Sequence, residues 1–470
     1  GIDGLTLSAD TLTVEINRPA ADASLVDYKA RAYPIDTGTS DSPSSLTLSL
    51  DGSEGALLRA RGNLTLDVFG FVQASGAFGI EKKTGSIRVA DKPSTQNIDE
   101  SATAVNVDML LVGASGLSAF AGVNGGQSNA LGLSMSGVDM GLALFTERLS
   151  GTSGTPRKWT SLQASVESAQ LGGIDGLTAS VSNLTVNVNR QATDGTVVDY
   201  SLDSTKTDGT RVSAVKVLTG PTSDLELTLD GKRGDLLEAR GKVELDVFGF
   251  VQVSGEFAFE RASAPMTVTL ADGTQRQASA LKVGASNLRA FAGVDGGSAN
   301  AMGLELSGVE FGLALLSDVN DATRNWTSLQ AKAQSAALVG ISGLVAAGDT
   351  LSIEVNRAGK AGDSVIDFSR ADPTDQASPR RTALTVATGL TSSLELGMSG
   401  AQGDLLRASG NLRLDVFGFF QASGAFAVER RDETVWLNDG VVSEDPTKAK
   451  APTKVNARLL TIGGTGIDAF

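Results

Sequence analysis

The hexapeptide LDVFGF at residues 66–71 returns at residues 245–250 and 414–419, and the sequence around these three copies decides the fold. Long matching stretches flank every copy, so the chain of 470 residues is built from duplicated units. Proteins made of near-identical units usually act through their length and shape. The duplication therefore favours a repetitive structural or binding protein over an enzyme with one catalytic pocket.

The repeat can be followed along the whole chain. GIDGL at residues 1–5 returns at 173–177 and, as GISGL, at 340–344. These starts define three repeat units, residues 1–172, 173–339 and 340–470. The third unit stops before the last quarter of the repeat, so we expect the chain to be a segment of a longer array. Strand-like sequence without proline runs from Trp159 to Arg190, across the first boundary, and predicts that the units share one continuous sheet.

Apolar and polar residues alternate from Asn63 to Glu81, through the first LDVFGF copy. This period of two predicts one long strand with a buried face, and Gly70 predicts a bend within it. Leu66 and Val68 lie on one side of the alternation, and the two phenylalanines of LDVFGF lie on the other. A strand that is apolar on both faces is expected to be buried on both. We therefore interpret the motif as the covered centre of each unit, where units stack.

The composition predicts an all-β fold. The chain has 55 Gly and only 11 Pro, and it lacks any apolar stripe of helical period and helix length. Two architectures remain open: repeated long antiparallel strands in a continuous elongated β-sheet rod, or a parallel β-solenoid. Short hairpin signals and the lack of a short coil period favour the antiparallel rod. The hairpin signals are Asp-Gly pairs at residues 51–52, 230–231, 272–273 and 439–440.

The chain has no Cys and no His, which excludes several kinds of site. Disulfide frameworks, iron–sulfur clusters and thiolate zinc all need Cys, and His is the commonest general base. No catalytic triad, P-loop or dinucleotide fingerprint is present, so we predict no enzyme and assign no catalytic or cofactor-binding residue. The net charge of −15 argues against nucleic acid as a partner, and no apolar run reaches the length of a transmembrane segment.

One metal site is conceivable, at two matching glycine-rich turns. Residues 124–129 read NGGQSN, and residues 295–300 read DGGSAN. Calcium prefers oxygen ligands, so the calcium candidates are Asn124, Asn129, Asp295 and Asn300. The alternative is a hairpin turn, in which Gly supplies a positive φ and Asn or Asp bonds to its own backbone. Turn chemistry is the stronger interpretation, because no known calcium-loop spacing occurs.

Two recurring groups of charged residues invite opposite interpretations. Asp67, Asp246 and Asp415 stand beside phenylalanines, where a carboxyl with a raised pKa or a sugar-binding acid is one hypothesis and a solvated surface acid is the other. Arg18 with Asp27, Arg190 with Asp199 and Arg357 with Asp367 flank a variable loop in each unit. We expect each of these three pairs to form a cross-strand ion pair.

The pattern LDVFGF(V/F)Q-x-SG-x-F at residues 66–78, followed by AFAGV at 119–123, GLAL at 141–144 and WTSLQA at 159–164, resembles the repeats of giant bacterial surface or secreted proteins. Such chains are described as large repetitive or adhesin-like proteins. The resemblance implies a bacterial, extracellular or cell-surface location and a tandem array. It supplies no site residues.

Two functions follow from these patterns. The first is a structural or adhesive segment that forms a β-rich rod or fibre, with neighbouring repeats or copies of itself as partners and cell-surface polysaccharide as a further candidate. The alternative is a β-groove that binds lipid or polysaccharide along an apolar face. The rod predicts that the apolar faces are covered, whereas the groove predicts a continuous exposed apolar channel.

Overall fold

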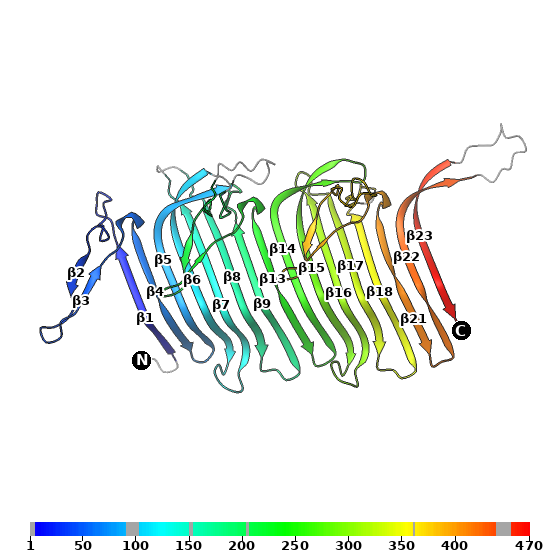
Figure 1. Cartoon of the computed structure of the whole chain (residues 1–470), viewed down its shortest axis with the longest axis horizontal. Helices are drawn as coiled ribbons and strands as arrows, with labels where there is room; N and C mark the ends of the chain where they lie inside the picture. Colours follow the sequence, from blue (N-terminus) through cyan, green and yellow to red (C-terminus); the bar gives the residue numbers. More distant parts are fainter. Residues whose placement is uncertain (1–4, 91–102, 150–153, 204–205, 361, 439–452) are drawn as a thin grey trace, which may run out of the picture. The chain divides into compact units, whose positions relative to one another are not determined.

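The computed structural model describes residues 5–90, 103–149, 154–203, 206–360, 362–438 and 453–470, and these form an all-β fold (Figure 1). Seventeen strands make one open, antiparallel sheet. They are β1 (Leu5–Asn17), β4 (Leu57–Val68), β5 (Val72–Ala90), β6 (Thr103–Val123), β7 (Leu131–Glu147), β8 (Lys158–Gly172), β9 (Leu177–Arg190), β10 (Val197–Val198), β13 (Leu236–Val247), β14 (Val251–Thr269), β15 (Gln275–Val294), β16 (Met302–Asp318), β17 (Asn325–Val339), β18 (Leu344–Ala358), β21 (Leu405–Val416), β22 (Phe420–Leu437) and β23 (Thr453–Ala469).

The long strands pair largely in chain order, each antiparallel to the next. Hydrogen-bonded ladders join β4 to β5, β5 to β6, β6 to β7 and β7 to β8, and the same succession recurs from β15 to β18. Consecutive strands linked by short turns can pair only in this antiparallel way, whereas parallel pairing needs a long crossover. The prediction of long antiparallel strands in a continuous sheet is confirmed, and the parallel solenoid is wrong.

The chain has two compact units. The first comprises residues 1–174, 180–239 and 262–264, and the second comprises residues 175–179, 240–261 and 265–470. The three sequence repeats recur within them as matching ladders. For example, β1 pairs with β4 and β18 pairs with β21 in equivalent registers, and both ladders shift at the same place, after Asp10 and after Asp349.

The LDVFGF motif is a hairpin turn, so the prediction of one long strand over residues 63–81 is wrong. Strand β4 ends at Val68 and β5 begins at Val72, and Val68 and Val72 are paired. Phe69 and Gly70 have φ of 53° and 68°, and the Phe71 N–H donates to the Val68 carbonyl oxygen at 2.9 Å. A three-residue connection keeps even-numbered residues on the same face before and after the turn. The alternation therefore passes through the reversal unbroken, and Gly70 marks a reversal instead of a bend.

The Asp-Gly signals have different outcomes. Asp272–Gly273 lies between β14 and β15, as predicted for a hairpin. Asp51 and Asp230 instead cap the short 3-10 helices η1 (Gly52–Glu54) and η2 (Gly231–Arg233) by accepting a backbone N–H, so a hairpin is wrong there. The pair at 439–440 lies outside the described residues.

Each repeat carries one long connection, which we name a cover loop. Cover loops 1, 2 and 3 are residues 18–56, 191–235 and 359–404, and they join β1 to β4, β9 to β13 and β18 to β21. Each contains a small two-stranded hairpin and a 3-10 helix. These elements are β2 (Tyr33–Asp36), β3 (Ser45–Leu48) and η1, then β11 (Lys216–Leu218), β12 (Asp224–Glu226) and η2, then β19 (Thr385–Ala387), β20 (Ser393–Glu395) and η3 (Gly400–Gln402).

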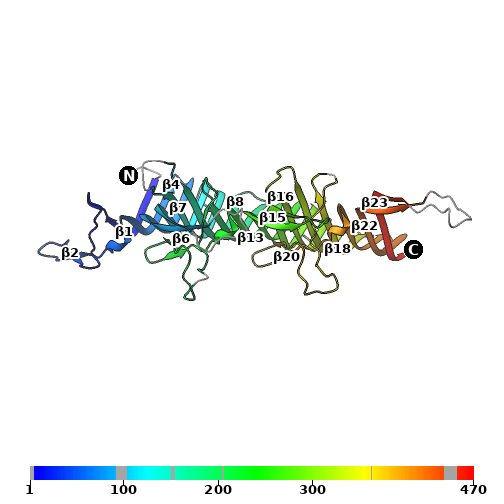
Figure 2. The same cartoon turned by 90° about the horizontal axis from the view of Figure 1, so that it is seen from above.

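Cover loops 2 and 3 lie against one face of the sheet, which we name the inner face (Figure 2). The hydrophobic cores lie between these loops and that face. In the first unit, cover loop 2 packs on β5 to β8. The shared core includes Ile87, Val89, Val107, Leu111, Phe145 and Trp159 of the strands and Val198, Tyr200, Val217, Leu227 and Leu229 of the loop. In the second unit, cover loop 3 packs in the same way on strands of the preceding repeat, and the core includes Val268, Leu316, Trp326, Ile366, Phe368, Val386 and Leu396.

Candidate assembly surfaces

The face of the sheet opposite the cover loops, named the outer face, carries rows of apolar residues. The strand registers of the first unit align them across six strands, from β1 to β8. Four such rows are Leu5–Val68–Val72–Ala121–Leu133–Leu171, Leu7–Leu66–Ala74–Ala119–Met135–Ala169, Val14–Ala60–Ile80–Val112–Leu142–Leu162 and Ile16–Leu58–Lys82–Leu110–Leu144–Thr160. Lys82 is the one charged residue in these rows. We name this zone the outer band.

The second unit repeats the outer band. Its rows cross seven strands, from β15 to β23. Two of them are Val283–Leu313–Leu329–Val355–Leu406–Arg430–Leu460 and Ala292–Leu304–Leu338–Ala346–Leu414–Ala422–Ala469. Arg430 stands where the first unit has Lys82, so a single basic residue per repeat marks the same edge of the band.

The outer band is uncovered within the described residues. Leu7 is 69% exposed, and Ile16, Leu58, Ile80 and Leu304 are exposed as well. Six strands about 4.8 Å apart and eleven residues of about 3.3 Å give the band of the first unit on the order of 900 Å². Exposed apolar patches on monomeric proteins seldom exceed roughly 300–600 Å², and larger ones mark interaction sites. The band is therefore a candidate contact surface.

The phenylalanines of LDVFGF lie at hairpin tips and are exposed, which contradicts the prediction of a covered centre. Phe69 and Phe71 are 57% and 54% exposed, and Phe419 of the third copy is 90% exposed. The tight turn causes this, because residues at a chain reversal have no strand on their far side. Phe69, Phe71 and Phe419 are therefore not part of a buried contact between units within the described part of the chain.

Asp67 is the residue that holds the hairpin closed. Its carboxylate accepts the Gly70 N–H at 2.8 Å and the Gln73 side-chain amide at 2.7 Å. The hydrogen bond from Gln73, followed by that from Gly70, lowers the pKa of Asp67. Asp246 and Asp415 make the same two contacts in their own hairpins. The hypothesis of a raised pKa is wrong for Asp67, and the hydrogen bonds make the acid a turn-forming residue in all three copies.

The calcium candidates lie in the turns that follow β6 and β15. Asn124 and Asp295 have positive φ, 56° and 55°, and their carbonyl oxygens accept the N–H of Gln127 and Ser298. Asn129 and Asn300 end the same turns. Among the described residues, no three Asp, Glu, His or Cys side chains converge to hold a metal. The turn chemistry accounts for these sequences, and calcium binding stays a prediction.

The prediction that Arg190 pairs with Asp199 and Arg357 with Asp367 is wrong. Arg190 pairs with Asp235 at 3.2 Å, and Arg357 pairs with Asp404 at 3.1 Å. Asp199 instead accepts the Gly231 N–H at 3.0 Å. The equivalent acids, Asp27 and Asp367, accept the N–H of Gly52 and Gly400. Each acid therefore fixes its cover loop to the start of the 3-10 helix, a role that sequence spacing did not indicate.

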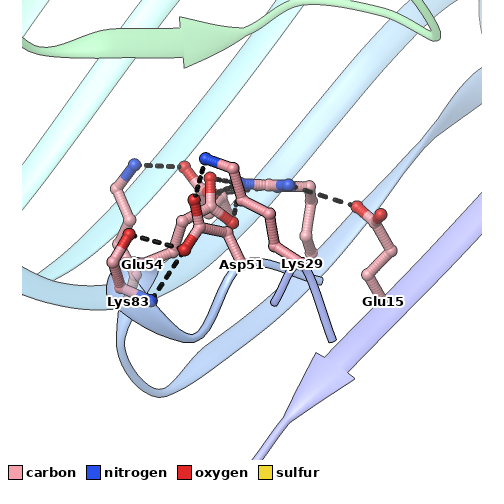
Figure 3. Close-up of polar contacts among 8 residues, drawn as sticks. Glu15, Lys29, Asp51, Glu54 and Lys83 are labelled. Carbon is pink, nitrogen blue, oxygen red and sulfur yellow. Dashed lines mark hydrogen bonds and ion pairs between the residues drawn. The ribbon is translucent and has the colours of Figure 1, made fainter. Parts of the chain in front are cut away.

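A row of alternating charges crosses the inner face beside cover loop 1 (Figure 3). Arg59 contacts Glu15 at 3.3 Å, Glu54 at 3.2 Å and the buried Glu81 at 2.6 Å. Burial opposes the charged form of Arg59, but the hydrogen bond and charge of Glu81 outweigh it and raise the pKa. Lys83 also pairs with Glu81, at 2.9 Å. These contacts join three neighbouring strands and attach cover loop 1 to its own repeat.

The third repeat rebuilds this charged row on equivalent strands. Arg407 contacts Glu354 at 2.8 Å and Glu429 at 2.6 Å. In the second repeat the central position is an acid, Glu238, which pairs with Arg233 of cover loop 2 at 2.5 Å. The row thus joins neighbouring strands to one another and to the cover loop.

A buried polar cluster fastens cover loop 2 to the sheet. The Tyr200 hydroxyl donates to Ser161 Oγ at 2.7 Å, Ser161 Oγ donates to Asn189 Oδ1 at 3.0 Å, and Asn189 Nδ2 donates to the Val198 carbonyl at 2.8 Å. Trp159 Nε1 donates to the Thr196 carbonyl at 3.1 Å. The third repeat keeps the equivalent Ser–Asn and Trp contacts. Buried polar groups that satisfy one another fix one position of the loop.

Sequence patterns did not identify the cover-loop contacts as a functional surface. The signal was present, since LELTL at 225–229 and LTLSL at 46–50 alternate as short strands do. Their docking partners lie one repeat earlier, and a single-sequence pattern does not reveal such long-range contacts.

No helix among the described residues combines the length and apolar character needed to cross a membrane. Comparison with protein-family models found no matching family, and comparison with curated proteins found no match.

Proposed function

We propose that this chain is a structural segment of a bacterial extracellular repeat protein, in which successive repeats extend one antiparallel sheet. One observation supports the proposal above the others: each internal cover loop packs on strands of the repeat before it. A repeat of this kind completes its core only with a neighbour, as in solenoid and array proteins. The resemblance of the sequence to giant bacterial surface proteins supports the extracellular location, and an adhesive role would act through the same array.

The test is the shape of single particles in negative-stain electron microscopy at low concentration. A segment that extends one sheet should give rigid particles of uniform width. Particles that resolve into separate beads joined by flexible hinges would contradict the proposal, because each repeat would then be an independent domain. Immunolabelling of intact source cells would test the extracellular location separately.

A second function, lipid binding along the outer band, is favoured by the exposure of that band. The rod hypothesis expected its apolar faces to be covered, and the band is uncovered within the described residues. Among the four rows of the first unit the one charged residue is the basic Lys82, and no acid is present. Incubation of purified protein with phospholipid vesicles, followed by flotation, tests this function. Co-flotation that is lost in Leu7→Asp would support it, and protein that stays in the dense fraction would contradict it.

A further inference from the structure

The two internal cover-loop interfaces share the same contacts, and these define what a docked cover loop needs. The Asp199 N–H donates to the Arg88 carbonyl at 3.0 Å, and the Asp367 N–H donates to the Thr269 carbonyl at 2.8 Å. Val198, Val217 and Leu227 of cover loop 2 are fully buried on the strands beneath. Their counterparts in cover loop 3, Ile366, Val386 and Leu396, are fully buried as well.

A glycine in the receiving strand makes the close approach possible. A Cβ on Gly113 would lie 2.3 Å from the Leu218 carbonyl oxygen of cover loop 2. A Cβ on Gly284 would lie 2.2 Å from the Ala387 carbonyl oxygen of cover loop 3. No real Cβ tolerates such distances to backbone, so these two positions accept only Gly while the loop is docked.

Cover loop 1 has the docking residues but no strands beneath it among the described residues. Val26 is 55% exposed, and Tyr33, Ile35 and Leu46 are also exposed. In sequence these residues match Val198, Val215, Val217 and Leu225 of cover loop 2. Its hairpin is nevertheless formed, because Ile35 pairs with Leu46 as Val217 pairs with Leu225. The loop therefore presents a preformed apolar surface.

Strands β22 and β23 have the opposite deficiency: they match the receiving strands β5 and β6, but no cover loop lies on them among the described residues. Val435 pairs with Val455 as Ile87 pairs with Val105. Leu437 is 53% exposed, whereas its counterparts, Val89 and Leu270, are buried. The matching list of receiving positions on this pair is Val435, Leu437, Val455, Ala457, Leu459 and Gly463.

Gly463 gives independent support for a missing loop. It occupies the position of Gly113 and Gly284, and a Cβ added to it would meet nothing within 4 Å. A strand interior that has room for a side chain gains stability from one, since Gly loses more conformational freedom on folding than Ala does. The glycine has no function within the described residues, but it is required if a cover loop docks there.

We propose that cover loop 1 of one copy of this chain docks on β22 and β23 of a second copy. The inference rests on the proposed function and names its partner surface. The Asp27 N–H would donate to the Trp436 carbonyl, and Ile35 would cover the apolar residues of β22 and β23, as in the two internal interfaces. One contact is not reproduced, because Arg31 stands where Ser213 and Thr382 bond to the receiving strand.

The two surfaces differ from each other, so this contact is head-to-tail. A head-to-tail contact that does not close into a ring adds copies without limit. The wild-type protein is therefore expected to show masses beyond the dimer as concentration rises. A contact through the outer band would instead pair identical surfaces and stop at a dimer.

Two single variants and their mixture test the proposal by analytical ultracentrifugation. Ile35→Asp damages the loop and leaves the receiving strands intact, whereas Gly463→Val fills the receiving surface and leaves the loop intact. Each alone should weaken association about 30-fold or more, as loss of a central interface residue does. An equimolar mixture should form a dimer and nothing larger, because one intact loop and one intact receiving surface remain.

The controls separate folding and other contacts from docking. Leu202→Asp changes another exposed apolar residue of a cover loop and should leave association as in wild type. Circular dichroism and thermal melts should show both test variants folded, since both positions are open in the single chain. Wild type that stays monomeric, variants that associate like wild type, or association abolished by Leu7→Asp would each overturn the proposal. None of these outcomes would contradict rigid single particles in electron microscopy. A failure of this proposal can therefore be told apart from a failure of the proposed function.

Discussion

Cover loops 1 and 2 have matching sequences and the same local fold, yet one is exposed and the other is buried. In both, a hairpin forms and the tyrosine N–H, of Tyr28 or Tyr200, donates to a leucine carbonyl at 2.9 Å. Ile35 is 40% exposed, and its counterpart Val217 is fully buried. The difference teaches that the hairpin is encoded locally, whereas burial depends on strands supplied by the preceding repeat.

The largest expected contrast comes from placing a carboxylate at equivalent positions of the two loops. Val217→Asp buries an unpaired charge in the core of the first unit and should cost at least about 4 kcal/mol of unfolding free energy. Ile35→Asp stays in solvent and should change it by less than about 0.5 kcal/mol. Urea denaturation at low protein concentration measures both. Similar losses for the two variants would mean that cover loop 1 is also docked in the single chain.

The sequence predicted the sheet but not the surfaces on it. Alternation over residues 63–81 identified strand structure, and the antiparallel pairing followed from short connections. The reversal at Gly70 was missed because a three-residue turn preserves the alternation, so period alone does not distinguish one long strand from a hairpin. The exposed Phe69 was then assigned to a buried face. Cover-loop docking was missed because its contacts join residues of different repeats, as between Arg88 and Ser213, which are 125 residues apart.

A second contrast compares glycines beneath a docked and an absent loop. Gly113→Ala places a Cβ 2.3 Å from the Leu218 carbonyl oxygen and should cost about 1–3 kcal/mol, because the backbone of the loop has to move. Gly463→Ala meets nothing within 4 Å and should stabilise the chain by about 0.5 kcal/mol through the unfolded state. Thermal melts of dilute protein compare the two. Equal destabilisation would show that backbone conformation, and not loop docking, requires these glycines.

Tyr200 offers a smaller contrast between the second and third repeats. Tyr200→Phe removes the hydroxyl that donates to Ser161, and one such hydrogen bond contributes about 1 kcal/mol. The third repeat already has Phe368 at this position and keeps the equivalent hydrogen bond, from Ser328 to Asn356 at 3.1 Å. The variant should therefore stay folded, with a slightly lower urea midpoint. A loss above about 3 kcal/mol would mean that the hydroxyl is essential to the whole polar cluster and that the two repeats are built differently.

The smallest expected effect is the loss of stability of cover loop 3 in acid, compared between wild type and a variant at Asp367. Burial of Asp367 favours its protonated form, but hydrogen bonds from the Gly400 N–H, Ser369 and the Arg381 guanidinium outweigh it and lower the pKa below the ordinary 3.8. A lowered folded-state pKa gives stability that is present above pH 3.8 and is lost as pH falls through the lowered value. Because Arg381 is partly exposed, its ion pair should contribute no more than about 1 kcal/mol.

Asp367→Asn isolates this carboxylate from the other acids of the chain. Urea midpoints of wild type and variant, measured from pH 5 down to pH 2, should converge as the wild-type carboxylate gains its proton. When both proteins also carry Arg381→Ala, the difference in urea midpoint at pH 5 between the chain with Asp367 and the Asp367→Asn variant should become smaller. It should not disappear, because the hydrogen bond from the Gly400 N–H, at 2.9 Å, remains. Parallel curves over the whole range would contradict a lowered pKa. They would also mean that the acid fixes the loop to its 3-10 helix equally well when it is protonated.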